Sequence, residues 1–224
     1  MSVSQLSASS QNYLKAIWGL QEWSDAPVTT SALASKLAVQ LSTVSDALSR
    51  LAAQGFIERE PYGPVALTES GQAYAVQMVR RHRLIETFLV QLLGYRWDQV
   101  HDEAESLEHA ASDFMVDRID ERLGFPRRDP HGDPIPGPRG DVTIPDATLL
   151  SQIASGSRVV VERISDDDPR LLQFFTDQGV GIGTIINVEA GSPYSDALEI
   201  TADGSTTVTL GSSATDAVWV SHTC

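Results

Sequence analysis

Three of the five histidines lie between residues 82 and 109, and each has a carboxylate at helical spacing. In the segment HDEAESLEHAASD, His101, Glu105 and Glu108 follow one another at i, i+4 and i+7. Residues at these spacings lie on the same face of a helix. A helical face that carries imidazole and carboxylate groups is suited to binding a metal ion. The candidate ligands, in chain order, are His82, Glu86, His101, Glu105, Glu108 and His109.

The donor types limit which metal could bind. Imidazole and carboxylate are borderline and hard donors, so they suit Mn(II), Fe(II), Co(II) or Zn(II) and disfavour Cu(I). The one cysteine, Cys224, is the last residue, which leaves no disulfide framework and no cysteine-based zinc cluster. The alternative is a set of solvated surface pairs, the commoner role of a single His/Glu pair. Two pairs and a third acid, on segments dense in apolar residues, favour the metal site.

Composition and charge limit the class of protein. With 224 residues and 42% hydrophobic content, the chain can form two or three small modules. Its net charge of -14 argues against a general polyanion binder, but residues 1–80 carry five basic and six acidic residues, so nucleic-acid contacts are expected there. No apolar run approaches the length of about 18 residues that a membrane span needs, and the opening MSVSQLSASSQ does not resemble a signal peptide. We expect a cytoplasmic protein.

The first third of the sequence has the pattern of a helix-turn-helix followed by a hairpin. Apolar residues at helical spacing predict a helix over residues 11–23, and two short amphipathic helices follow over residues 29–37 and 42–55. The stretch FIEREPYGPVALT alternates apolar and polar residues around 61–64, as a two-stranded hairpin does. Together these elements predict a winged helix, and the alternative is a helix pair that serves packing alone. Asn12 is by default the N-cap of the first helix.

Beyond residue 68 the pattern changes twice. Residues 69–123 are helical and rich in apolar residues that would otherwise be exposed, which indicates pairing with another subunit or domain. Residues 125–145 hold six of the eleven prolines and form an extended arm. Five β-rich runs and one helix near 171–176 then predict a small barrel. His131, in the arm, and His222 are expected to be solvated. The strands are expected at 158–164, 184–189, 197–201, 206–210 and 217–221.

The order of these features resembles one known family across the whole chain. A winged helix, the motifs RRHRLIE, VHDEAESLEH and DPHGDPIPG, and a small barrel are together similar to the diphtheria toxin repressor family of metal-dependent transcriptional repressors. Within it, the chain most resembles the manganese-responsive transport regulators of actinobacteria. The resemblance implies a mainly α fold with a small β part, a homodimer joined through the central helices, and a metal corepressor. It divides the chain into a winged helix DNA-binding domain at 1–74, a helical metal-binding and dimerisation domain at 75–141, a linker at 142–152 and an SH3-like (FeoA-like) domain at 153–224.

The resemblance also implies which residues hold metal. One site would draw on His82, Glu86 and His101, with an acid from the C-terminal domain. Asp168 in the segment SDDDP is the best match for that acid, and Asp166 is second.

A second site would draw on Glu105, Glu108 and His109. Asn12 would reach into it from the first helix. Glu105 stands where iron-responsive members carry cysteine, and Asn12 where they carry methionine. Replacing two sulfur donors by oxygen donors makes the site harder and shifts the preference from iron toward manganese. A bound ion would tie the first helix to the dimerisation helices, and without it the acids would repel one another and the modules would hinge.

The expected function is that of a manganese-dependent repressor that binds double-stranded operator DNA as a metal-activated homodimer and controls metal-uptake genes. It is not expected to be an enzyme or to need a membrane or a small organic substrate. Fe(II) is the alternative activator, and Zn(II) or Co(II) could bind in vitro. A metal-dependent hydrolase is a more distant alternative, for which the sequence offers no separate nucleophile or acid/base pair.

The resemblance assigns base readout to the start of the second short helix. There Gln can pair with adenine, Asp can accept from cytosine, and a Thr methyl group can touch thymine. Basic residues nearby are candidates for phosphate contacts. The base-reading candidates are Gln40, Ser42, Thr43 and Asp46; Ser45 would lie near a phosphate, and Lys36, Arg50 and Arg59 would contact phosphates.

Overall fold

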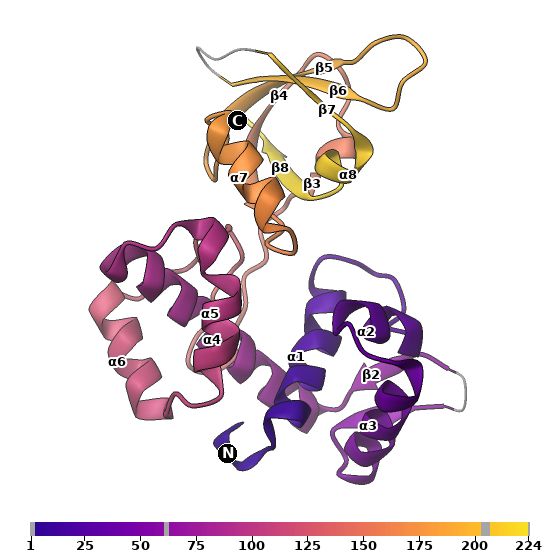
Figure 1. The fold of residues 1–224 in the computed structure, drawn as a ribbon, viewed down its shortest axis with the longest axis vertical. Coiled ribbons are helices and arrows are strands. Elements are labelled where there is room, and N and C mark those ends of the chain that lie inside the picture. Colours follow the sequence, from indigo (N-terminus) through magenta and orange to yellow (C-terminus); the bar gives the residue numbers. More distant parts are fainter. Residues whose placement is uncertain (1–2, 61–62, 203–206, 224) are drawn as a thin grey trace. The chain divides into compact units, whose positions relative to one another are not determined.

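The structure, a computed structural model, describes residues 3–60, 63–202 and 207–223 (Figure 1). Pro61 and Tyr62 of the predicted hairpin turn, Thr206 at the start of a predicted strand, and Cys224 lie outside the described residues. The chain forms two compact units. The first comprises residues 1–85, 105–122 and 136–142, and the second comprises residues 86–104, 123–135 and 143–224.

The first unit begins with a winged helix, as the sequence predicts. Side-chain hydroxyl groups cap the N-termini of two of its helices. Ser7 Oγ accepts from the Ser10 N–H, and Thr29 Oγ1 accepts from the Ala32 N–H. A 3-10 turn, η1, precedes the first helix. The elements are η1 (Val3–Gln5), α1 (Ala8–Glu22), α2 (Thr30–Lys36), α3 (Leu41–Ala53) and the antiparallel wing strands β1 (Ile57–Arg59) and β2 (Val65–Leu67).

Asn12 is not the N-cap of α1, and this sequence-based expectation is wrong. Ser7 supplies the capping oxygen, so the helix begins at Ala8 and Asn12 lies within its second turn. Residues three apart in a helix share a face, which places Asn12 beside Lys15 on α1.

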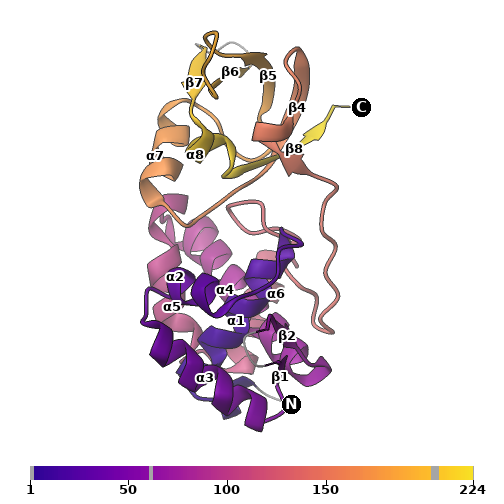
Figure 2. The same cartoon turned by 90° about the vertical axis from the view of Figure 1, so that its right-hand side faces the viewer.

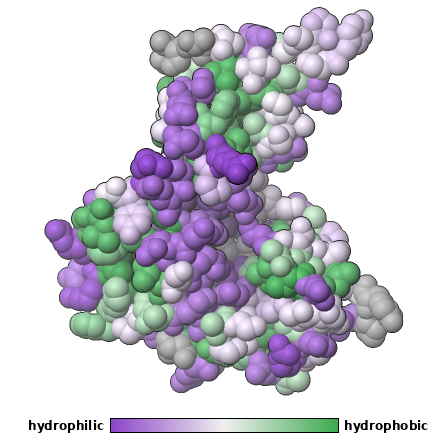
Figure 3. All heavy atoms as spheres, viewed as in Figure 1, coloured by the Kyte–Doolittle hydropathy of each residue, from purple (hydrophilic) through white to green (hydrophobic). Residues whose placement is uncertain are grey.

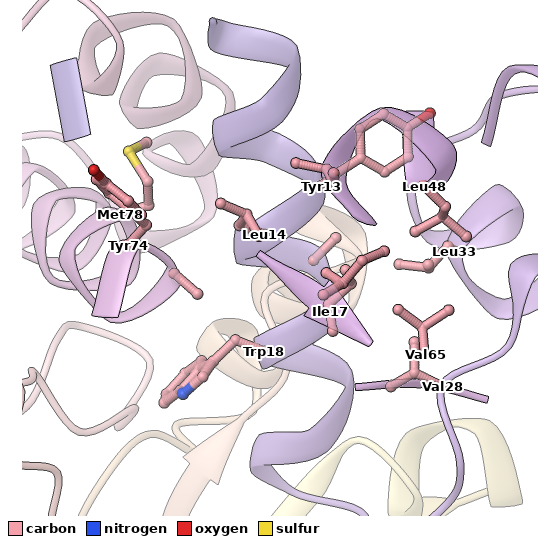
Figure 4. Close-up of a cluster of buried hydrophobic side chains, with 14 of the residues drawn as sticks. Tyr13, Leu14, Ile17, Trp18, Val28, Leu33, Leu48, Val65, Tyr74 and Met78 are labelled. Carbon is pink, nitrogen blue, oxygen red and sulfur yellow. The ribbon is translucent and has the colours of Figure 1, made fainter. Parts of the chain in front are cut away.

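One apolar core joins the winged helix to the helix that follows it. In Figure 4, Tyr13 and Ile17 of α1 point toward α2, α3 and the wing, whereas Leu14 and Trp18 point toward Tyr74 on α4. These four α1 side chains are at most 6% exposed. Because burying a large apolar side chain contributes roughly 1.5–3 kcal/mol, α1 is held firmly on both sides.

Three further helices carry the predicted ligands. α4 (Glu69–Leu93) starts tightly against the wing: a Cβ on Gly71 would lie 1.9 Å from the Phe56 carbonyl oxygen, so glycine is needed there. α4 begins in the first unit and ends in the second, where Gly94 adopts a φ of 74° and stops the helix. The elements that follow are η2 (Trp97–Gln99), α5 (His101–Glu108) and α6 (Asp113–Leu123).

The second unit contains an antiparallel sheet with the strand order β3-β8-β4-β5-β6-β7, of which Figure 2 labels β4 to β8. All five predicted strands are present, and β3 is an additional one. The predicted small SH3-like β domain is confirmed, although within the described ranges the edge strands β3 and β7 do not pair and the sheet does not close into a full barrel. These edges have two and three residues, too few for a ladder that would close the sheet. The elements are β3 (Thr148–Leu149), η3 (Leu150–Gln152), β4 (Ser157–Ile164), α7 (Pro169–Asp177), β5 (Ile185–Ala190), β6 (Leu198–Ala202), β7 (Val208–Leu210), α8 (Ser212–Thr215) and β8 (Val218–His222).

Apolar side chains reach the surface around α5 and α6. Leu107, Phe114 and Met115 are 39%, 74% and 48% exposed, and Figure 3 shows hydrophobic residues, in green, at the surface of this helical part. Grouped exposure of this kind usually marks contact with another protein surface. No helix in the described part of the chain has the length and apolar character needed to cross a membrane.

Candidate metal centres

The first unit gathers two predicted acids and one predicted histidine around a lysine. Glu108 is fully buried; its Oε2 accepts from His82 Nδ1 at 2.6 Å and its Oε1 accepts from Lys15 Nζ at 2.7 Å. Lys15 also forms an ion pair with Glu105. One ligand atom from each of His82, Glu105 and Glu108 lies within 4.8 Å of the others. The spacing of Glu105 and Glu108 in the sequence predicts that they share one face of α5, but it gives no sign of Lys15.

Glu108 is held in its ionised form. Burial alone would raise the pKa of this carboxyl group, but the hydrogen bond and charge of His82 and the charge of Lys15 outweigh burial and lower it. An ionised, buried carboxylate with two lone-pair-bearing oxygens is the form that coordinates a metal.

His109 is oriented by a residue that the sequence analysis did not identify. Its Nδ1 donates to Gln11 Oε1 at 2.7 Å, and Gln11 Nε2 in turn donates to the Val3 and Leu6 carbonyl oxygens at 2.9 and 3.0 Å. With its proton on Nδ1, the imidazole keeps a lone pair on Nε2, which lies 3.8 Å from Glu108 Oε1. This is the usual way in which a hydrogen-bond partner prepares a histidine to bind metal.

Asn12 supplies a further oxygen on α1. Its side-chain Oδ1 is buried and has no hydrogen-bond partner among the described residues. A buried acceptor without a partner costs about 1–3 kcal/mol, which a bound cation would offset. The carboxylates, the imidazoles and this amide oxygen therefore fit a divalent metal of the first transition row.

The second unit contains a further group on α4, α5 and the loop between β4 and α7. His101 Nδ1 donates to Asp166 Oδ2 at 2.7 Å and lies 3.7 Å from Glu86 Oε1. Burial alone would lower the pKa of His101, but the hydrogen bonds and charges of Asp166 and Glu86 raise it to about 10. Glu86 is 1% exposed, so it is not a solvated surface acid.

The acid beside His101 is Asp166 rather than Asp168, which was the preferred candidate. Asp168 is the N-cap of α7, where its Oδ1 accepts from the Arg170 N–H at 2.9 Å. The physical reason is Pro169, whose fixed φ suits the first position of a helix and leaves the preceding residue as the cap.

His131 is fully buried, so the expectation that it is solvated is wrong. Its Nε2 donates to the Trp97 carbonyl oxygen at 2.8 Å and its ring stacks on Trp97. Its Nδ1 makes no hydrogen bond within the described structure and lies 3.9 Å from Glu86 Oε2. Burial alone would lower the pKa of His131, but the charges of Glu86, Asp129 and Asp166 raise it.

A tight turn in the proline-rich arm positions His131. Asp129 Oδ1 accepts from the His131 N–H at 2.8 Å and from the Asp133 N–H at 2.9 Å. Gly132 follows with a φ of 92°, and a Cβ there would lie 2.1 Å from the Glu162 carbonyl oxygen. The segment DPHGD carries the turn-forming residues for this arrangement, but local sequence does not show that the turn packs into a core. His222, in contrast, is exposed as expected.

The predicted DNA-reading residues lie on the exposed face of α3 and at its N-terminus. Val44, Ala47, Leu48 and Leu51 bury the opposite face of the helix. Arg59, on β1, is half-buried. The residues Lys36, Gln40, Ser42, Thr43, Asp46 and Arg50 are exposed, and Ser45 is half-buried.

Comparison with known proteins supports both parts of this arrangement. The models for the iron dependent repressor N-terminal DNA binding domain, the iron dependent repressor metal binding and dimerisation domain, and the FeoA domain match residues 5–65, 68–137 and 148–222. The iron-dependent repressor IdeR of Mycobacterium leprae is 33% identical over 88% of this chain and 90% of its own length. The diphtheria toxin repressor of Corynebacterium glutamicum is 31% identical over 79% and 81%.

Among solved structures, a manganese-dependent transcriptional repressor in complex with manganese superposes with a TM-score of 0.91 and 48% identity, covering 96% of this chain and 100% of that one. ScaR with bound Zn2+ gives 0.81 and 27% over 96% and 99%. The fold and the site thus define a metal-dependent, DNA-binding transcriptional repressor, a regulator rather than an enzyme. The chain belongs to the diphtheria toxin repressor family of metal-dependent repressors.

Proposed function

We propose that Mn(II) is the ion that activates this repressor and that the regulated genes serve metal uptake. The observation that carries the proposal is the donor set of the first unit, which combines two carboxylates, imidazole and the orphaned oxygen of Asn12, with no sulfur among the described candidates. Hard oxygen donors favour Mn(II) over softer ions. The similar repressor that contains manganese adds support.

Fe(II) is the second candidate, because the relative from Mycobacterium leprae is an iron-dependent repressor. Carboxylate and imidazole groups also bind Fe(II), and intrinsic affinity rises from Mn(II) toward later ions. Selectivity for manganese would therefore have to come from the geometry and hardness of the site.

Two sites are proposed. The first site would draw on oxygens from α1 and α5 and on His109 Nε2, which keeps a lone pair because Nδ1 carries the proton donated to Gln11 Oε1. The second site would draw on the buried group around Glu86, including His131, which was expected from the sequence to be solvated. A divalent cation bound at either site would supply positive charge that offsets the converging carboxylates. The proposed ligands of the first site are Asn12, Glu105, Glu108 and His109. Those of the second site are Glu86, His101, Asp166 and His131, together with His82, which the resemblance assigns to this site and which shares a face of α4 with Glu86.

The position of α1 explains how metal binding would reach the DNA-binding helix. Asn12 lies on one face of α1, and Tyr13 and Ile17 on other faces pack against the helix-turn-helix (Figure 4). Engaging Asn12 would thus fix α1, and through its core contacts it would fix the orientation of α3. Coupling between two sites of this kind is typically about 1–3 kcal/mol.

Binding to operator DNA would use the exposed face of α3 in a major groove. A homodimer would present two such helices about one helical turn of DNA apart. The exposed apolar side chains of Leu107, Phe114 and Met115 would form part of the dimer contact.

The test is a DNA-binding titration under anaerobic conditions, with a fragment from upstream of a metal-transporter gene and with Mn(II), Fe(II) and Zn(II) added separately. Glu105→Cys introduces the sulfur donor that iron-responsive members carry at this position. Glu103→Cys is the matched control because Glu103 is exposed on the same helix. We expect Mn(II) to activate at a lower free concentration than Fe(II), and Glu105→Cys to reduce that preference while Glu103→Cys does not. Equal activation of the unaltered protein by Fe(II) would refute the manganese proposal.

A further inference from the structure

The ammonium group of Lys15 contacts the carboxylates of both Glu105 and Glu108 in the first unit. Lys15 Nζ contacts Glu105 Oε1, lies 2.7 Å from Glu108 Oε1 and lies 3.4 Å from His82 Nδ1. The Lys15 side chain is 16% exposed, so water screens these contacts only partly. The positive charge of Lys15 therefore offsets the repulsion between these carboxylates, a contribution that the expectation drawn from the sequence did not include.

Lys15 and a divalent ion would need the same oxygen atoms. Glu108 Oε1 and Glu105 Oε1 are the lone-pair donors closest to the ammonium group. Two cations cannot both lie at bonding distance from the same pair of oxygens without strong mutual repulsion. Lysine is a compact point charge on a flexible four-carbon stem, so it can withdraw from the acids without a change in the backbone.

We infer that Lys15 is a tethered cation that competes with the activating metal and thereby sets the metal concentration at which the repressor responds. The inference rests on the proposed function, because it requires Glu105 and Glu108 to be metal ligands. Lys15 joins α1 to α5 through these acids. Metal binding would then replace the Lys15 link between the two helices by a link through Asn12.

An ammonium group has no preferred coordination geometry, so its competition lowers the affinity of every divalent ion by a similar factor. Lys15 would set the metal concentration at which the repressor responds, and the ligands would determine which ion binds with the higher affinity. A role in ion choice would instead change the affinity for one ion much more than for another.

The first test measures metal affinity directly in the full-length protein by calorimetry, with Mn(II) and Co(II) titrated separately. Lys15→Leu removes the charge and adds no atom that can bind metal, whereas Lys15→Arg retains the charge. The chain has one other lysine, Lys36, which is exposed on α2, so Lys36→Leu is the matched control. We expect Lys15→Leu to tighten binding of both ions about tenfold, the scale of a charge-assisted hydrogen bond, and the other two variants to resemble the unaltered protein.

The second test needs no variant. Protein labelled with 13C at the lysine ε carbon should give two resonances, one from Lys15 and one from Lys36. Titration with the diamagnetic ion Cd(II) should move the Lys15 resonance in proportion to site occupancy and leave that of Lys36 in place.

The outcomes separate the two proposals. Metal binding of equal or lower affinity in Lys15→Leu, or a Lys15 resonance that does not move on metal binding, would overturn the role of Lys15 alone. Absence of stoichiometric metal binding by the unaltered protein would overturn the proposed ligand set, and the competition with it.

Discussion

Glu108 is the carboxylate on which the first metal-site cluster depends, and neutralising it should destabilise the metal-free protein. Glu108→Gln keeps the shape of the side chain but removes the charge that pairs with Lys15 and His82. Hydrogen bonds to charged groups contribute about 1.5–3 kcal/mol. Because Lys15 keeps its contact with Glu105, we expect a loss of about 2 kcal/mol at pH 7. For a chain of this length, that corresponds to a decrease in Tm of about 4–8 °C.

The pH dependence follows from the lowered pKa of Glu108. A carboxyl group whose pKa is lower in the folded state stabilises the protein above its ordinary value of 4.5, and this stabilisation is lost as the pH falls through the folded-state pKa. The gap in Tm between Glu108→Gln and the unaltered protein should therefore be full at pH 7 and shrink in acid.

The assay is thermal unfolding followed by circular dichroism with a chelator present, at several pH values from 7 to 3. Glu103→Gln is the matched control, because an exposed acid on the same helix should contribute less than about 0.5 kcal/mol. Equal Tm values for Glu108→Gln and the control at pH 7 would refute the reasoning. A gap that is the same at pH 7 and pH 3 would show that shape, rather than charge, is responsible.

Three further predictions concern the second unit and the wing. His101, with a pKa raised to about 10, is protonated at neutral pH, so metal binding should release a proton and tighten as the pH rises. Calorimetry in buffers of different ionisation enthalpy measures this release. Metal binding without proton release would contradict the assignment of His101 as a ligand. Asp166→Asn should return the pKa of His101 toward its ordinary value in an NMR titration, whereas Asp168→Asn should leave that pKa unchanged. Gly71→Ala should lower the free energy of unfolding by about 2 kcal/mol or more, because the added Cβ would overlap the Phe56 carbonyl oxygen; an unchanged denaturant midpoint would show that α4 can shift.

Local patterns in the sequence determined most of the secondary structure and the faces on which the ligands lie. Helical periodicity predicted the helical region 69–123 that contains α4, α5 and α6, but not the break between Glu108 and Asp113, and alternation predicted β4 to β8, because both periods are properties of the backbone within one element. The same reasoning put Glu105 and Glu108 on one face of α5. Where it failed locally, as at Asn12, a better cap stood five residues earlier, at Ser7.

The tertiary structure alone decided which groups meet. Lys15 and Glu105 are separated by 90 residues, and Gln11 and His109 by 98, so no local pattern could pair them. The burial of His131 likewise depends on how the arm packs against Trp97. Periodicity reports which face of an element is apolar, but the identity of the opposing side chain depends on how whole elements pack, and that packing is a property of the complete chain.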